Sequence, residues 1–249
     1  MGWFVGSAIV VMYLIYLTIS VLLIIGVQLI RKYREKHSRI ALYLIFHIVF
    51  FLVSFSLSAL MLTTEYGHDY WNWEVPYLRR YVVGIGYGFS AIGIVFLVLF
   101  INAVFGLRKT VKYFLIIYGI LLFPIMAHPD NHWEVIEIEP YTFDLRPISE
   151  PLFVFYLIIV GTAVAFGGFR AASKASEKQY EVALRFIGFG GVCMLLAVVF
   201  LLIDTYIAIF WVWHYNVASW ISWILIMLAA ICFYCGYTLP KFIMRLLKI

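Results

Sequence analysis

Residues 4–39 read FVGSAIVVMYLIYLTISVLLIIGVQLIRKYREKHSR, a long run without any charged residue that ends in a cluster of basic residues. A hydrocarbon core about 30 Å thick is crossed by a helix of about 20 apolar residues, so residues 4–30 can span a bilayer. Lys and Arg next to membrane spans are retained on the cytoplasmic side. This stretch therefore predicts a membrane-spanning helix that starts outside the cell and ends inside it.

The same pattern recurs along the chain, which contains seven apolar segments of sufficient length. They cover residues 4–30, 39–62, 81–105, 110–127, 152–169, 184–209 and 217–238. Of the 18 Lys and Arg residues, all except Arg79, Arg80 and Arg146 lie in or beside the connections after the first, third and fifth segments, or after the seventh. This distribution predicts an amino terminus outside and a cytoplasmic carboxyl terminus.

The predicted fold class is therefore all-α: a multi-pass integral protein of the cell membrane, with residues 1–249 forming a single seven-transmembrane-helix bundle. A mean hydropathy of +1.00 and a content of 12% charged residues exclude a soluble or disordered chain. The longest connection is the outer loop 128–151, which leaves no room for a soluble catalytic domain. The net charge of +5 reflects topology, so we expect membrane lipids rather than nucleic acid as partners.

The outer end of the predicted bundle carries the aromatic residues that suit a ligand site. All eight tryptophans map there, either as an aromatic belt at the headgroup level or as the wall of a pocket. Trp71 and Trp73 lie in a loop, which favours a pocket for at least these two. The candidate ligand-binding residues are Trp71, Trp73, His132, Trp133, Trp211 and His214.

Polar residues within the second segment recur at helical spacing. His47, Ser54, Ser58 and Glu65 fall within about 20° of one line on a helix. One interpretation is a stripe that faces the bundle and is satisfied by neighbouring backbone carbonyls. The other is a ligand- or proton-sensing track centred on His47, because histidine titrates near neutral pH.

Two further intramembrane positions predict contacts between helices. Asp204 is the carboxylate inside an apolar run, and it needs a partner to stay ionised. Arg79 and Arg80 at the start of the third segment are the expected partners, in a structural clamp or in a ligand-gated switch. Asn102 is expected to make an interhelical hydrogen bond.

Histidines and aspartates also cluster at the predicted outer end. The candidate metal ligands are His68, Asp69, His128, Asp130 and His132, and this chemistry suits zinc or copper. Without such a metal, no cofactor is predicted. Retinal is excluded, because the seventh segment lacks the buried lysine that a Schiff base requires.

Small residues form stripes that predict close contacts between helices. The stripes are Gly84, Gly88 and Ala91 in the third segment, Gly161, Ala165 and Gly168 in the fifth, and Gly188, Gly190 and Gly191 in the sixth.

Two short segments accompany the predicted topology: the outer segment Pro129-Asp-Asn-His132-Trp133, and the inner segment Gln179-Tyr-Glu-Val-Ala-Leu-Arg185 before a glycine-rich span. In its topology and in these two segments, the chain resembles the seven-transmembrane amino-terminal sensor region of prokaryotic histidine kinases. It implies a sensor that detects an outer ligand. Because no kinase domain follows the seventh segment, the resemblance implies signalling through a separate partner.

These observations favour a non-enzymatic receptor- or sensor-like module. It would detect a ligand or condition at its outer face and signal to a cytoplasmic protein partner through the inner loops, and the sequence also allows a homodimer. Two alternatives remain open. One is an accessory subunit of a larger membrane complex, and the other is a metal-dependent membrane enzyme built on the outer His/Asp cluster.

Overall fold

The computed structural model describes all residues except 1, 72–77, 129–130, 132–144, 212–215, 241–242 and 246–249, and it omits the side chains of 2–8, 65–71, 78–81, 146 and 206–211. Within the described residues the fold is helical, with seven long helices. They are α1 (Gly2–Lys36), α2 (Arg39–Trp71), α3 (Leu78–Phe105), α4 (Lys109–Met126), α5 (Arg146–Ala172), α6 (Lys178–Trp211) and α7 (Val217–Thr238). Each contains a segment long and apolar enough to cross a membrane, which confirms the predicted all-α architecture with seven apolar helices.

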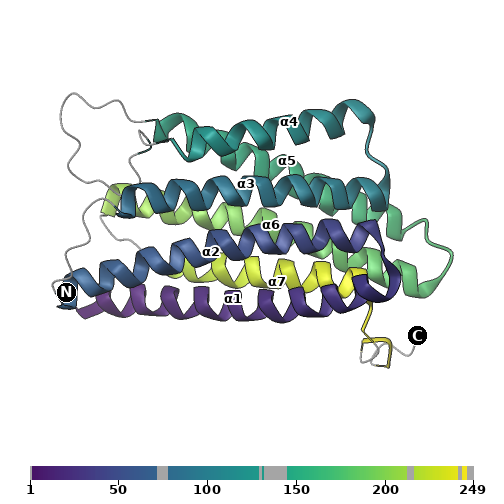
Figure 1. Ribbon diagram of the computed structural model, residues 1–249, viewed down its shortest axis with the longest axis horizontal. Coiled ribbons are helices and arrows are strands. Elements are labelled where there is room, and N and C mark those ends of the chain that lie inside the picture. Colours follow the sequence, from purple (N-terminus) through teal and green to yellow (C-terminus); the bar gives the residue numbers. More distant parts are fainter. Residues whose placement is uncertain are drawn as a thin grey trace.

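The helices lie side by side as one up-and-down bundle (Figure 1). Contacts between α1 and α2, α2 and α3, α3 and α5, α5 and α6, α6 and α7, and α7 and α1 close a ring of six helices. Helix α4 packs against α3 and α5 on the outside of this ring. The interior of the ring is therefore enclosed by α1, α2, α3, α5, α6 and α7.

Several helices extend beyond the apolar segments read from the sequence. Helix α1 has 35 residues and α6 has 34, which corresponds to about 50 Å of helix against a hydrocarbon core of about 30 Å. Helix α5 begins at Arg146, so the predicted loop 128–151 is shorter than expected. Pro147 occupies the first turn, where the missing N–H has no intrahelical partner to lose, and proline there starts a helix instead of breaking it.

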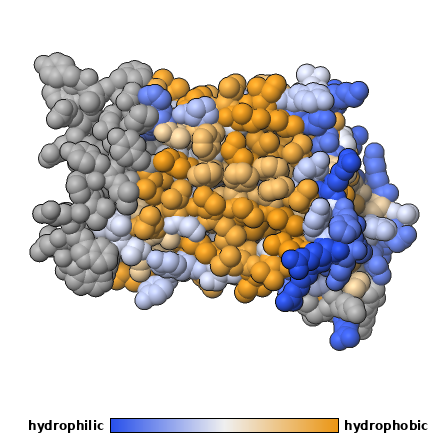
Figure 2. Space-filling model, in the orientation of Figure 1, coloured by the Kyte–Doolittle hydropathy of each residue, from blue (hydrophilic) through white to orange (hydrophobic). Residues whose placement is uncertain are grey.

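The surface of the bundle has an apolar waist next to an end that is rich in hydrophilic residues (Figure 2). Large apolar side chains on the waist point outward, including Ile24, Ile117 and Phe166, as expected for a surface that faces lipid. One end, called here the basic end, carries the short connections after α1, α3 and α5, with Arg34, Lys36, Arg108, Lys109 and Lys174. The opposite end is called the far end.

The connections at the basic end are tightly closed. Gly106 links α3 to α4 with φ of 72°, a left-handed conformation that glycine adopts without a steric cost. Lys32 on α1 donates to the carbonyl of Thr238 at the end of α7, with 3.1 Å between Nζ and O. These contacts hold neighbouring helix ends together where the chain reverses direction.

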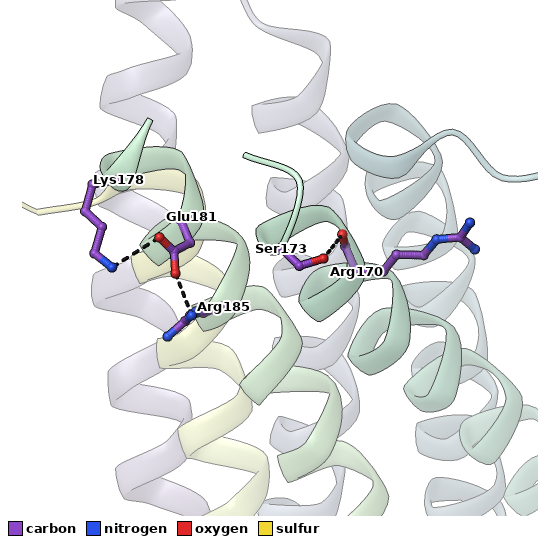
Figure 3. Close-up of polar contacts among 5 residues, drawn as sticks. All are labelled: Arg170, Ser173, Lys178, Glu181 and Arg185. Carbon is purple, nitrogen blue, oxygen red and sulfur yellow. Dashed lines mark hydrogen bonds and ion pairs between the residues drawn. The ribbon is translucent and has the colours of Figure 1, made fainter. Parts of the chain in front are cut away.

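The two helix ends that flank the α5–α6 turn each carry local polar contacts (Figure 3). Ser173 donates its hydroxyl to the carbonyl of Arg170 at the end of α5, at 2.9 Å. On the first turns of α6, Glu181 accepts from Lys178 at 3.1 Å and pairs with Arg185 one turn further on. Such exposed i,i+3 and i,i+4 pairs stabilise a helix only weakly, so their main effect is to order this end of α6.

A buried asparagine joins α4 to α5 at the far end. Asn131 is fully buried and donates its side-chain amide to the carbonyls of Ile125 and Met126, the last residues of α4. Ser149 in the first turn of α5 donates its hydroxyl to the amide oxygen of Asn131. Asn131 thus satisfies carbonyls that the end of α4 would otherwise leave unpaired.

Candidate functional site

His47 lies inside the helix ring on α2 and is 7% exposed. Its Nδ1 is 2.8 Å from the carbonyl oxygen of Gly93 on α3. A carbonyl can only accept, so Nδ1 carries the hydrogen, and in the neutral imidazole Nε2 is left as an acceptor. A Cβ on Gly93 would lie 2.7 Å from the ring of Phe51, so glycine is needed for α2 and α3 to approach this closely.

Two serines connect α2 and α3 further along the same face. The hydroxyl oxygens of Ser54 and Ser90 are 2.7 Å apart and buried. Ser58, one turn beyond Ser54, donates to the carbonyl of Ser54 at 3.2 Å. The hydroxyl that accepts within the Ser54–Ser90 pair keeps its own hydrogen, which remains available for a further bond.

These polar groups line one side of a cavity of about 130 Å³ at the centre of the ring. The polar side comes from α2 and α3, with His47, Ser54, Ser58 and Ser90. The remaining wall is mainly apolar and comes from α1, α5, α6 and α7, including Leu22, Leu157, Met194, Ala197, Val198, Leu201, Ile226, Ala229 and Ala230. Ligand sites typically combine such an apolar wall with a few converging polar groups.

Aromatic rings form both ends of this cavity. Towards the far end, Trp223 packs edge-on against Phe55, with ring centroids 5.0 Å apart, and Tyr87 packs against Phe153 at 5.5 Å. Towards the basic end, Phe233 lies 6.2 Å from the ring of His47. Trp223 and Phe233 are ten residues apart on α7, so the cavity extends over about 15 Å along the bundle.

The size of the cavity limits what it can hold. An engineered apolar cavity of about 150 Å³ binds benzene, so a volume of 130 Å³ accommodates a group of about six carbon atoms. A peptide or a folded partner is far too large. The arrangement suits a small molecule with an apolar body and one hydrogen-bonding group.

The structure places the intramembrane residues predicted from the sequence in different surroundings. His47, Ser54 and Ser58 all line the cavity, which supports a stripe that faces the bundle interior and leaves a ligand-binding role open. Asn102 is half-buried near the basic end of α3 and is not part of the cavity wall. Asp204 is half-buried at the far end of α6, and the predicted partners Arg79 and Arg80 lie outside the described side chains.

Most of the predicted outer site lies outside the described residues. This applies to Trp73, His132, Trp133, His214 and Asp130, and to the side chains of Trp71, Trp211, His68 and Asp69. His128 is described and lies exposed just after α4. Among the described residues no three His, Cys, Asp or Glu side chains form a metal-binding group, so the outer metal cluster stays a prediction.

Of the residues in the cavity wall, only His47, Ser54 and Ser58 were predicted from the sequence, and the polar residue Ser90 was not. Ser90 lies between Gly86 and Gly93 at spacings of four and three residues, a small-residue face that the structure turns towards α2. This periodic pattern was a signal that could have identified Ser90. Trp223 lies towards the far end, which corresponds to the predicted outer end, and it packs in the ring interior against Phe55.

No family model matches the sequence, and no curated protein or solved structure matches it significantly. The cavity and its side chains are therefore the basis for a functional assignment.

Proposed function

We propose that this protein is a receptor-like membrane module that binds a small amphipathic molecule in the cavity inside its helix ring. The observation that carries the proposal is the division of the cavity into a polar side and an apolar wall. His47, Ser54, Ser58 and Ser90 lie together on the α2–α3 side, whereas the other helices contribute almost only apolar side chains. These groups also join α2 to α3, and the proposal assigns them a second role as the polar side of a binding site.

The polar side determines the chemistry of the proposed ligand. Nε2 of His47 accepts a hydrogen bond, while the Ser54–Ser90 pair offers one hydroxyl hydrogen. A hydroxyl or amine group on the ligand can use both, since it donates and accepts. The expected ligand is therefore a compact apolar molecule that carries one hydroxyl or amine.

Binding in this cavity provides a route to a signal. A ligand that touches six helices at once stabilises the arrangement in which all six contacts are made. The ligand shifts the equilibrium between two helix arrangements only if it binds one of them more tightly. A tenfold higher affinity for one arrangement shifts this equilibrium by about 1.4 kcal/mol.

The charge distribution indicates where the signal would leave the membrane. By the positive-inside rule, the basic end faces the cytoplasm and the far end faces outward. The α5–α6 turn at the basic end presents exposed Arg170, Lys174, Lys178 and Arg185, a surface suited to an acidic protein partner. The resemblance to the sensor region of histidine kinases agrees with such a role in signal transduction.

The proposal is tested with 6-bromohexan-1-ol, which has a short apolar chain, one hydroxyl and a bromine that quenches tryptophan fluorescence. The protein is held in lipid nanodiscs, and fluorescence is measured as the alcohol is titrated. We expect saturable quenching of Trp223, identified as the component that is lost in Trp223→Phe. Ala230→Phe places a ring in the cavity and should abolish the saturable component.

Ala103→Phe is the matched control, because Ala103 is exposed on α3 away from the cavity. It should retain the quenching seen in the unmodified protein. Quenching that rises linearly without saturation, or that persists unchanged in Ala230→Phe, would reflect alcohol dissolved in the lipid and would contradict the proposal.

A further inference from the structure

Helices α5 and α6 are packed backbone to backbone over the half of their length nearest the basic end. A Cβ on Gly168 would lie 2.5 Å from the backbone nitrogen of Gly188. A Cβ on Gly191 would likewise collide with the backbone of Ala165. These contacts confirm the predicted close approach at Gly168, Gly188 and Gly191, whereas Gly190 faces Phe233 on α7. They leave no space for a molecule to pass between the helices there.

The same two helices enclose a second hollow towards the far end. It measures about 50 Å³ and lies between the segments 150–157 of α5 and 198–205 of α6. Large side chains, including Phe153, Leu157 and Leu201, line this part of the contact in place of glycines. Leu202, in its wall, is 43% exposed, so the wall of the hollow includes a residue at the surface of the bundle.

The hollow adjoins the central cavity directly. Five residues belong to the walls of both, namely Tyr87, Phe153, Leu157, Val198 and Leu201. The two spaces therefore share part of their walls. A passage between the two spaces requires rotation of these side chains and does not require a helix to unfold.

The outer rim of the hollow is polar. Thr205 on α6 lies 3.4 Å from the carboxylate of Glu150 on α5 and donates to it. Both residues lie near the helix ends, at the depth where the polar group of a membrane-dissolved amphiphile resides. A hydroxyl or amine that leaves the interface can exchange hydrogen bonds with this pair on its way inward.

We propose that the central cavity is filled from the bilayer through the hollow between α5 and α6, and that its ligand is a membrane-dissolved, single-chain amphiphile with one hydroxyl or amine. This inference rests on the function proposed above and specifies both the ligand class and its path. The polar group passes Glu150 and Thr205 and reaches Ser54, Ser90 and His47. The apolar chain follows through the hollow and remains against lipid-like side chains.

The test measures how fast 6-bromohexan-1-ol from preloaded vesicles quenches Trp223 in stopped-flow mixing with the protein in nanodiscs. Leu202→Trp covers the opening of the hollow and should slow association and dissociation alike by about tenfold, with little change in Kd, because it alters the path and not the site. Leu202→Ala enlarges the opening and should accelerate both rates. This second variant keeps the test decisive if the tryptophan variant folds poorly.

The matched controls are Leu196→Trp and Leu196→Ala. Leu196 lies on the same helix, is also 43% exposed and belongs to neither wall, so both control variants should keep the rates of the unmodified protein. Rates in the Leu202 variants equal to those of the controls would overturn the proposed path while leaving the cavity as the binding site. A changed Kd with an unchanged association rate would make the hollow part of the site and would also overturn the path. Absence of saturable quenching in the unmodified protein would refute the binding function itself.

Discussion

The hydrogen bond between Ser54 and Ser90 joins two helices where both line the cavity. Its hydroxyl oxygens are 2.7 Å apart, and both side chains are almost fully buried. No bulk water reaches this depth in a membrane, so a hydroxyl that loses its partner has few substitutes. The pair therefore has two effects: it holds a hydroxyl at the cavity wall and it stabilises the contact between α2 and α3.

Replacing Ser54 by alanine should lower the stability of the folded bundle. We expect a loss of about 0.5–2 kcal/mol in the free energy of unfolding, the range typical of hydrogen bonds between membrane helices. Ser56→Ala is the matched control, since Ser56 is exposed on the same helix, and it should change stability little. The measurement is reversible unfolding in mixed micelles.

A double-mutant cycle separates this bond from other effects of the substitution. If the two hydroxyls act as a pair, Ser54→Ala together with Ser90→Ala should cost clearly less than the sum of the two single changes. Strict additivity would show that the two serines act independently and would contradict the pairing.

The contact between α5 and α6 depends on glycines at positions where any side chain would meet backbone. A Cβ on Gly191 would lie 2.9 Å from the carbonyl oxygen of Gly161, and backbone atoms cannot move aside as a flexible side chain can. Gly26 on α1 is different, because a Cβ there would meet only the side chain of Ile48, at 3.7 Å. Alanine substitution at these two glycines therefore separates the cost of a steric clash from the benefit of a better helix-forming residue.

Gly191→Ala should destabilise the bundle by about 1–3 kcal/mol, as overpacking of a tight contact does. Gly26→Ala should be neutral or stabilising by up to about 1 kcal/mol, because alanine is the better helix former and has room. Unfolding of both variants in mixed micelles gives the comparison. Equal effects at the two positions would mean that α5 and α6 are not in backbone contact.

Features that depend on one segment of the chain could be predicted from the sequence, whereas features that depend on how several helices pack could not. The seven helices and the face shared by His47, Ser54 and Ser58 depend on apolar length and helical period, and both are local properties of the chain. The partnership of Ser54 with Ser90 depends on how α2 and α3 rotate against each other, which no single segment encodes. The cavity is a consequence of six helices packed together, so it could not be located from any one of them.

The orientation of the bundle in the membrane is a property of all connections together, and it can be tested at one position on each end. Lys174 lies exposed in the α5–α6 turn, and His128 lies exposed after α4 at the opposite end. A membrane-impermeant maleimide added to intact cells should label His128→Cys, whereas Lys174→Cys should react only after lysis. The reason is the retention of basic connections in the cytoplasm, which acts on every loop of the basic end at once.

The native cysteines lie within α6 and α7, so the unmodified protein gives the background signal. Labelling of Lys174→Cys in intact cells would show that the bundle has the opposite orientation. The proposal of a cytoplasmic partner at the basic end would then be wrong.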